Sequence, residues 1–275
     1  SIPFSIYGFT SVYGNRESIG NFPDHISEKN CSIFELISST LSRADQKEAR
    51  ETLLKQSVIL DTSWRCAFAS DAENLGSTPL YETILCSEYI IKEFKAKHSI
   101  QKVNAIFLTD GEGDSLYTYS PSYDHNVRTY GSALAIKFNN KIVKSNSRYN
   151  VGSNLLTELK NIPGVSVIGF YVCKDMYEFK GQVYKTSRYN DKITTDENIS
   201  VARKAYNKDK FWSVDNTLGY DKYFILKGHS LNTDNDELSL TPHAKKAPIT
   251  KAVKKHASSK KGNRGLATQF GKLVA

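Results

Sequence analysis

Two short apolar runs, each ended by turn residues, stand out in the hydrophobic pattern of this chain. The first covers 103–108 and stops at Thr109-Asp110-Gly111, and the second covers 165–172. Apolar runs of this length are typical of strands buried in a parallel sheet, whose carboxyl ends meet at an edge where ligands bind. We therefore predict two core strands, the first of which carries Asp110 into a loop at that edge.

Helical spacing predicts the helices that accompany these strands. Ser77-Thr78-Pro79 is a typical helix start, because a hydroxyl residue caps exposed amides and proline suits the first helical position. The apolar face that follows extends this helix to about Lys97, just before the first core strand. A helix, a buried strand and an acidic loop in this order form half of a βαβ unit, which indicates an α/β fold with a mostly parallel sheet.

Alternation and turn residues predict further strands and a hairpin. Strands are expected at 2–9 and 223–226, and a hairpin joins 134–138 to 141–144 across Asn139-Asn140, whose side chains tolerate the positive φ of a two-residue turn. A short strand is also expected at 57–60. The Tyr/Ser-rich stretch 117–130 is predicted to be a loop.

Weaker helical patterns occur elsewhere in the chain. Ile33, Phe34, Ile37 and Leu41 recur at helical spacing, and the charged segment after them predicts a helix over 43–55. Short helices are expected over 151–160 and near 200–207. Leu266, Phe270 and Leu273 recur at helical spacing within the last twelve residues, so these predict a short amphipathic helix at 264–275.

The positive charge of the chain is concentrated near its end. The formal net charge is +8, but nine of the 37 Lys and Arg residues and none of the 29 Asp and Glu residues lie from 238 onward. The remaining 28 basic residues balance the 29 acidic ones, so the body at 1–237 is nearly neutral. Residues 238–263 have the composition of a flexible basic linker. The basic segment 245–264 is interpreted either as a nucleic-acid contact or as a tether, and the 16 tyrosines all precede it.

Cysteine spacing and hydropathy indicate the cellular compartment in which the protein is expected. Cys31, Cys66, Cys86 and Cys173 form no C-x-x-C pair, which favours buried thiols in a reducing compartment. Apolar stretches are shorter than a bilayer requires, so we expect a soluble, cytoplasmic protein. The chain starts at Ser1 and enters a strand at once, and we therefore expect that it is truncated at its N-terminus.

Thr78 and Asp110 are the leading candidates for chemistry. A hydroxyl and a carboxylate at one sheet edge suit a hard cation such as Mg²⁺ or Mn²⁺. Ser77, Glu112 and Asp114 are possible additional ligands. In the plainer interpretation Thr78 only caps a helix, Asp110 only begins a turn, and the other two carboxylates are solvated. No G-x-S-x-G elbow, Walker A loop or histidine cluster is present, which argues against an enzyme.

Three segments carry a resemblance to a known family. These are Ile6-Tyr7-Gly8-Phe9-Thr10, Gly76-Ser77-Thr78-Pro79-Leu80 and Ile106-Phe107-Leu108-Thr109-Asp110-Gly111, followed by a V-x-V-I-G-F strand. In this order they resemble von Willebrand factor A domains. The first is similar to the A domain of the cobaltochelatase subunit and of related phage-encoded proteins that work with a MoxR-type AAA+ ATPase. The resemblance implies a Rossmann-like three-layer α/β/α domain over 1–237, with a hairpin insertion near 132–144.

The resemblance also implies a metal site that this chain holds only in part. In the family, a D-x-S-x-S loop after the first strand, a threonine and an aspartate hold the ion, and the last two correspond to Thr78 and Asp110. The D-x-S-x-S loop is not found, so the first strand is expected to be missing. Asp61-Thr62-Ser63-Trp64-Arg65 has Arg65 in place of the second serine and follows the strand at 2–9, so it is treated as a chance match.

The function implied by the resemblance is binding, not catalysis. We expect a metal-dependent protein-binding module that acts with an AAA+ ATPase, located in the host cytoplasm if it is phage-encoded. Leu266, Phe270 and Leu273 are predicted to dock the partner. Two alternatives remain: a nucleic-acid-associated protein that binds through its basic tail, and an accessory subunit of a metal chelatase.

Overall fold

The structure is a computed structural model of the 275-residue chain. It describes residues 2–10, 31–62, 78–110, 113, 117–120, 125–128, 134–145, 150–190, 195–228 and 261–274. The chain divides into two compact units, which are described separately. Unit 1 is Ser1–Val103 with Glu112–Gly164, and unit 2 is Asn104–Gly111 with Val165–Ala275. The predicted boundary at 237 lies outside the described residues, and the predicted tail at 264–275 falls largely within the last helix.

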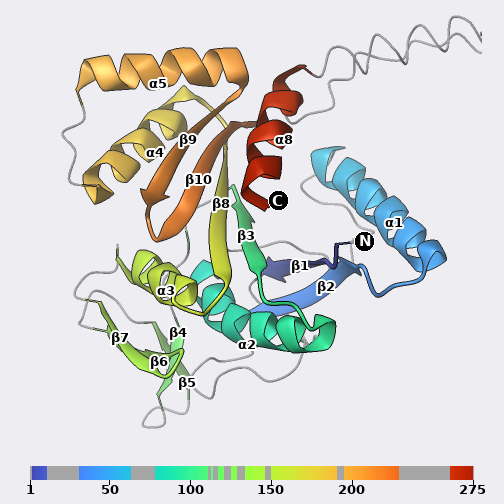
Figure 1. Cartoon of the computed structure of the whole chain (residues 1–275). Helices are drawn as coiled ribbons and strands as arrows, with labels where there is room; N and C mark the ends of the chain where they lie inside the picture. The colour runs from blue at the N-terminus through green and yellow to red at the C-terminus, as the bar shows by residue number, and fades with distance from the viewer. Residues whose placement is uncertain are drawn as a thin grey trace, which may run out of the picture. The chain divides into compact units, whose positions relative to one another are not determined.

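Unit 1 contains three helices and three two-stranded antiparallel sheets among its described residues (Figure 1). The helices are α1 (Arg43–Thr62), α2 (Leu80–His98) and α3 (Val151–Lys160). The sheets pair β1 (Ser5–Thr10) with β2 (Ser32–Ser38), β4 (Tyr117–Ser120) with β5 (His125–Arg128), and β6 (Leu134–Phe138) with β7 (Lys141–Ser145).

The segment predicted to be helical from Ile33, Phe34, Ile37 and Leu41 is instead strand β2. It pairs with β1, so that Ile33 lies opposite Phe9 and Ile37 opposite Ile6. A spacing of four residues is a multiple of two, so Ile33 and Ile37 can also recur on one side of a strand. The prediction was therefore wrong because a spacing of four residues fits both a helix and a strand. Pairing with β1, which is distant in sequence, makes this segment a strand.

The helix predictions in the charged and capped segments are confirmed. α1 covers the expected 43–55 and continues to Thr62, so the strand expected at 57–60 is wrong. α2 starts at Leu80, with Pro79 as its N-cap residue, and ends at His98, one residue beyond the expected end. α3 matches the predicted 151–160. The stretch 117–130, predicted to be a loop, contains β4 and β5.

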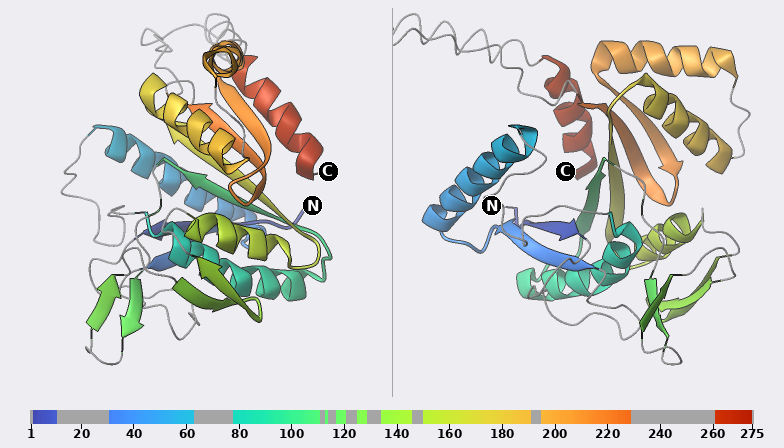
Figure 2. Two further views of the ribbon diagram at one scale, coloured as in Figure 1. Left: turned by 90° about the vertical axis from the view of Figure 1, so that its left-hand side faces the viewer. Right: turned by 180° about the vertical axis from the view of Figure 1, so that it is seen from behind.

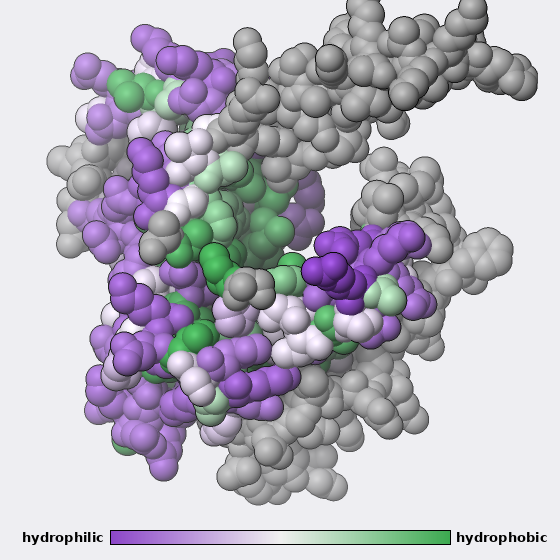
Figure 3. All heavy atoms as spheres, turned by 45° about the vertical axis from the view of Figure 1, so that its right-hand side comes forward, coloured by the Kyte–Doolittle hydropathy of each residue, from purple (hydrophilic) through white to green (hydrophobic). Residues whose placement is uncertain are grey.

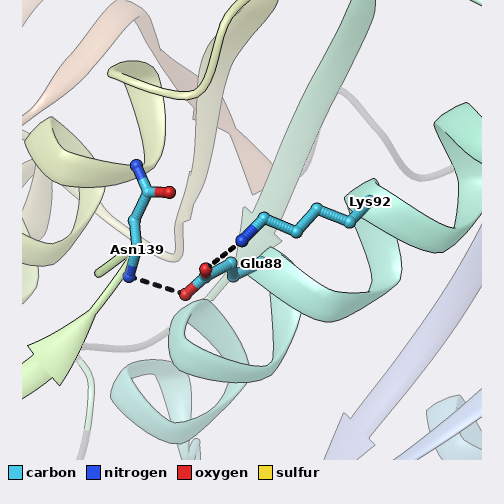
Figure 4. A network of polar contacts seen from close by, with 3 residues as sticks. All are labelled: Glu88, Lys92 and Asn139. Atoms are coloured by element: carbon cyan, nitrogen blue, oxygen red, sulfur yellow. Dashed lines mark hydrogen bonds and ion pairs between the residues drawn. The ribbon is translucent and has the colours of Figure 1, made fainter.

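The hairpin of β6 and β7 forms as predicted and is attached to α2. Asn139 and Asn140 adopt φ values of 47° and 60°, the left-handed pair that a tight two-residue turn requires. The buried carboxylate of Glu88 accepts a hydrogen bond from the Asn139 N–H at 2.8 Å and pairs with Lys92 (Figure 4). Because Glu88 belongs to α2, this network fixes the hairpin tip to the helix.

Gly164 ends the turn after α3 in a conformation that favours glycine. Its φ is +76°, and a Cβ at this position would lie 2.1 Å from the Gln101 carbonyl oxygen. The Gly164 carbonyl accepts a hydrogen bond from the Val103 N–H at 2.9 Å. The turn that ends at Gly164 is therefore also the point where the chain approaches the start of the first core strand.

Unit 2 is built on a four-stranded, mostly parallel sheet in the order β3-β8-β10-β9. Its strands are β3 (Val103–Thr109), β8 (Val165–Cys173), β9 (Phe211–Thr217) and β10 (Tyr220–Lys227). β10 runs parallel to β8 and antiparallel to β9. The predicted strands at 103–108, 165–172 and 223–226 are confirmed, and so is the mixed α/β class.

One face of this sheet, the α4/α5 face, is covered by α4 (Met176–Tyr189) and α5 (Asp196–Asp209). Phe179 and Tyr206 stack with ring centroids 4.0 Å apart, and both are buried. Tyr223 is hydrogen-bonded through its hydroxyl to Gln182 Oε1 at 3.2 Å, and the Thr217 hydroxyl donates to the Thr186 carbonyl at 3.3 Å. Apolar packing and polar contacts together hold this layer.

The other face, the α8 face, consists of Ile168, Phe170, Val172, Phe211, Phe224 and Leu226. It is covered by α8 (Lys261–Val274), through Leu266, Phe270 and Val274. The two views of Figure 2 show α8 on the opposite side of the sheet from α4 and α5. Unit 2 is thus a three-layer α/β/α arrangement, and the predicted C-terminal amphipathic helix is confirmed as an element.

Two elements of unit 2 were not predicted. Helix α4 contains Gly181, and its polar composition conceals its apolar face, while β9 has a weakly alternating sequence. Among the described residues, no helix has the length and apolar content to cross a bilayer.

Candidate functional site

Asp110 lies at the carboxyl end of β3, as the sequence predicted. β3 is an outer strand of the unit 2 sheet within the described part of the chain, because β8 is its one neighbour in the strand order. The Asp110 side chain is exposed. A carboxylate at the carboxyl end of a strand in a mostly parallel sheet occupies the usual ligand-binding edge of an α/β fold.

The strand that carries Asp110 has exposed apolar side chains. Ile106 and Leu108 are 47% and 59% exposed, whereas Phe107 between them is buried and packs edge-on against Tyr220. Figure 3 shows hydrophobic residues at the molecular surface near α8 and the strands beside it. Strands of parallel sheets are normally covered on both faces, so an apolar outer strand of this kind is suited to accept further structure.

Thr78 lies two residues before α2 in unit 1. Its carbonyl accepts a hydrogen bond from the Leu80 N–H at 2.7 Å, and its side chain is partly buried. Pro79 holds the N-cap position without a side-chain capping bond. The sequence predicted a hydroxyl cap with Pro79 at the first helical position, and this is wrong by one residue. Pro79 is itself the N-cap residue, so Thr78 lies one position before the cap.

Gly113, three residues after Asp110 in sequence, lies close to the start of α2. Gly113 belongs to unit 1, and a Cβ added there would lie 3.1 Å from both Leu80 Cβ and Tyr81 Cε1. Glycine is thus favoured at 113 because the α2 side chains approach its backbone closely. Glu112, Asp114 and Ser77, the possible additional ligands, lie outside the described residues.

The donor types at these positions suit a hard cation, but their number is small. Thr78 supplies a hydroxyl and Asp110 a carboxylate, which are ligands that Mg²⁺ and Mn²⁺ accept. An octahedral ion needs more oxygen ligands, from water or from other segments. Among the described residues, no group of three or more His, Cys, Asp and Glu side chains is arranged to hold a metal.

Sequence reasoning did not single out a buried polar cluster on α2. Glu82 is 1% exposed, and Cys31 and Cys86 are buried near it. Burial raises the pKa of Cys31 to about 12, with the charge of Glu82 adding to the effect, and it raises that of Cys86 further. These thiols therefore remain protonated and unreactive near neutral pH, which agrees with their predicted role as core residues.

Other predicted residues have structural roles in the described regions. Leu266 and Phe270 pack on the α8 face, with the Phe270 and Phe170 rings 5.9 Å apart, while Leu273 is 40% exposed. Asp61 and Thr62 of the discounted D-x-S-like segment belong to the end of α1, and 63–65 lie outside the described residues. The basic segment is described only from Lys261 onward.

Comparison with protein-family models, with curated proteins and with solved structures finds no match.

Proposed function

We propose that this protein is a noncatalytic, metal-dependent protein-binding module of the von Willebrand factor A type. The observation that carries the proposal is Asp110, an exposed carboxylate at the carboxyl end of an outer strand in a mostly parallel sheet. A Mg²⁺ or Mn²⁺ ion bound there with an open coordination position would accept a carboxylate from a partner. Partner binding would then depend on metal occupancy.

Thr78 is proposed as a second ligand of the same ion on the strength of the family resemblance, in which a threonine and an aspartate hold the metal together. A hydroxyl and a carboxylate are both ligands that Mg²⁺ accepts.

The further oxygen ligands that an octahedral ion needs are proposed to come from water and from Ser77, Glu112 or Asp114, the possible additional ligands.

The proposed partner is an AAA+ ATPase of the MoxR type, on the strength of the family resemblance. The test is binding of a purified MoxR-type ATPase to the full chain, with Mg²⁺ and with EDTA. We expect binding in Mg²⁺ that is lost in EDTA and in Asp110→Asn.

Asp209→Asn is the matched control, because Asp209 is an exposed carboxylate of the same unit at the end of α5. It should bind like the wild type. Binding that survives both EDTA and Asp110→Asn would contradict the metal-dependent proposal.

A further inference from the structure

The exposed side of α4 carries aromatic and basic side chains in alternation. Tyr177, Lys180, Tyr184, Lys185 and Arg188, here called the α4 tyrosine stripe, project from one side of the helix. With 3.6 residues per turn they lie within an arc of about 140°, opposite the side that packs on the sheet. The tyrosines of the chain all precede the basic tail, but α4 carries basic residues of its own beside two of them.

The two tyrosines of the stripe are displayed to solvent. Tyr177 is 84% exposed and Tyr184 is 47% exposed. They are two helical turns apart, about 10 Å along the axis. Gly181 lies between them in sequence, and an added Cβ there meets no atom within 4 Å, so the helix surface at this position is open.

The stripe lies on a helix with more basic than acidic residues. Residues 176–189 contain Lys180, Lys185 and Arg188 against one acidic residue, Glu178. The Glu178 carboxylate accepts a hydrogen bond from the Lys174 N–H, and Asp175 caps the helix through the N–H groups of residues 177 and 178. These carboxylates are engaged at the helix start, away from Tyr184.

We infer that the α4 tyrosine stripe binds single-stranded nucleic acid. Exposed aromatic rings stack on bases of any sequence, and interleaved cations neutralise the phosphates between them. An acidic peptide would use the cations but need not offer a planar group to each ring, whereas every nucleotide carries both a base and a phosphate. The inference goes beyond the proposed function and is independent of the basic tail, since it places a stacking surface on the folded unit.

The test is binding of the full chain to a fluorescent 15-nucleotide oligothymidine across a range of salt concentrations. Tyr177→Ala and Tyr184→Ala should each weaken binding by about tenfold without changing the salt dependence. Lys180→Gln should instead reduce the slope of log affinity against log salt by about one. The matched control is Tyr89→Ala, because Tyr89 of α2 is 48% exposed and lies outside the stripe.

Gly181→Leu gives a second test that does not depend on removing a ring. Leucine raises helix propensity, so the fold should be kept while the space between the tyrosines is filled and binding falls. Heparin, a polyanion without bases, separates stacking from charge: its binding should be unaffected by the tyrosine changes. Oligothymidine binding that is absent, or equal in wild type, Tyr177→Ala and Tyr184→Ala, would overturn the inference.

Discussion

The two faces of the unit 2 sheet are covered in different ways. The α4/α5 face is covered by helices that follow β8 directly in sequence, and it combines stacked aromatic rings with hydrogen bonds such as that between Tyr223 and Gln182. The α8 face is covered by one helix from the end of the chain, separated from β10 by residues 228–260. Its contacts with the sheet are apolar and involve partly buried side chains.

This difference indicates that the two layers have unequal stability. Fully buried side chains contribute more than partly buried ones, and the long connection before α8 gives this helix a modest effective concentration at the sheet. Local opening should therefore release α8 before α4 or α5. Because Leu266 and Phe270 already contact the sheet, any partner that they dock would compete with the α8 face for the same side chains.

The largest expected effect is on the α4/α5 face. Phe179→Ala removes a fully buried ring that stacks on Tyr206, and we expect it to lower the free energy of unfolding by about 3–5 kcal/mol. Urea unfolding monitored by circular dichroism measures this. A loss below about 1 kcal/mol would contradict the tight packing of this layer.

Removing α8 should have a smaller effect. Deletion of 261–275 exposes the α8 face but leaves the sheet and the other layer intact, so we expect a loss of about 2 kcal/mol and retained cooperative unfolding. Binding of a hydrophobic dye should rise because Phe170, Phe211 and Phe224 become accessible. Complete unfolding of the truncated chain would show that α8 is as essential as α4.

Single substitutions in α8 sharpen the comparison. Phe270→Ala should cost about 1–2 kcal/mol, because the ring is partly buried against Phe170. Leu273→Ala, at a position 40% exposed on the same helix, should change the free energy of unfolding by less than about 0.5 kcal/mol. Equal effects of the two substitutions would contradict the docked orientation of α8.

Alkaline pH should weaken unit 2 through Cys173. Burial, reinforced by the charge of Glu178, raises the pKa of Cys173 from 9.0 to about 12. Above about pH 9 the unfolded thiol ionises while the folded one stays protonated, so stability is complete below pH 9 and falls toward pH 12. Cys173→Ala should reduce this decline in urea titrations at successive pH values. An unchanged pH dependence would show that Cys173 does not contribute to it.

The core strands and the α2 boundaries could be predicted because their signals are local. The run 165–172 lacks charge, and Asn139-Asn140 allows one common hairpin geometry. β2 could not be predicted, because Ile33 and Ile37 fit both a helix and a strand, and only pairing with β1 decides between them. Helix α4 did carry a signal that was missed: Asp175 followed three residues later by Glu178 resembles a capping box.

For the candidate site, the sequence predicted the residues and their ligand types but not their surroundings. Thr78 and Asp110 were identified because a helix start and a strand end are marked by turn residues. Long-range packing determines which face of the sheet α8 covers, and it also determines the buried environment of Glu82. No local sequence pattern predicts either feature. The α4 tyrosine stripe was not predicted either. Its residues share one side only when 176–189 is a helix, and that helix was not predicted.

The most direct test of the metal-dependent proposal is Mn²⁺ binding measured by electron paramagnetic resonance. Wild type, Asp110→Asn and Asp209→Asn would be compared at equal protein concentration. We predict saturable binding to the wild type and to Asp209→Asn that is reduced at least tenfold in Asp110→Asn. Equal binding by all three proteins would contradict the assignment of Asp110 as a metal ligand, and with it the proposed function.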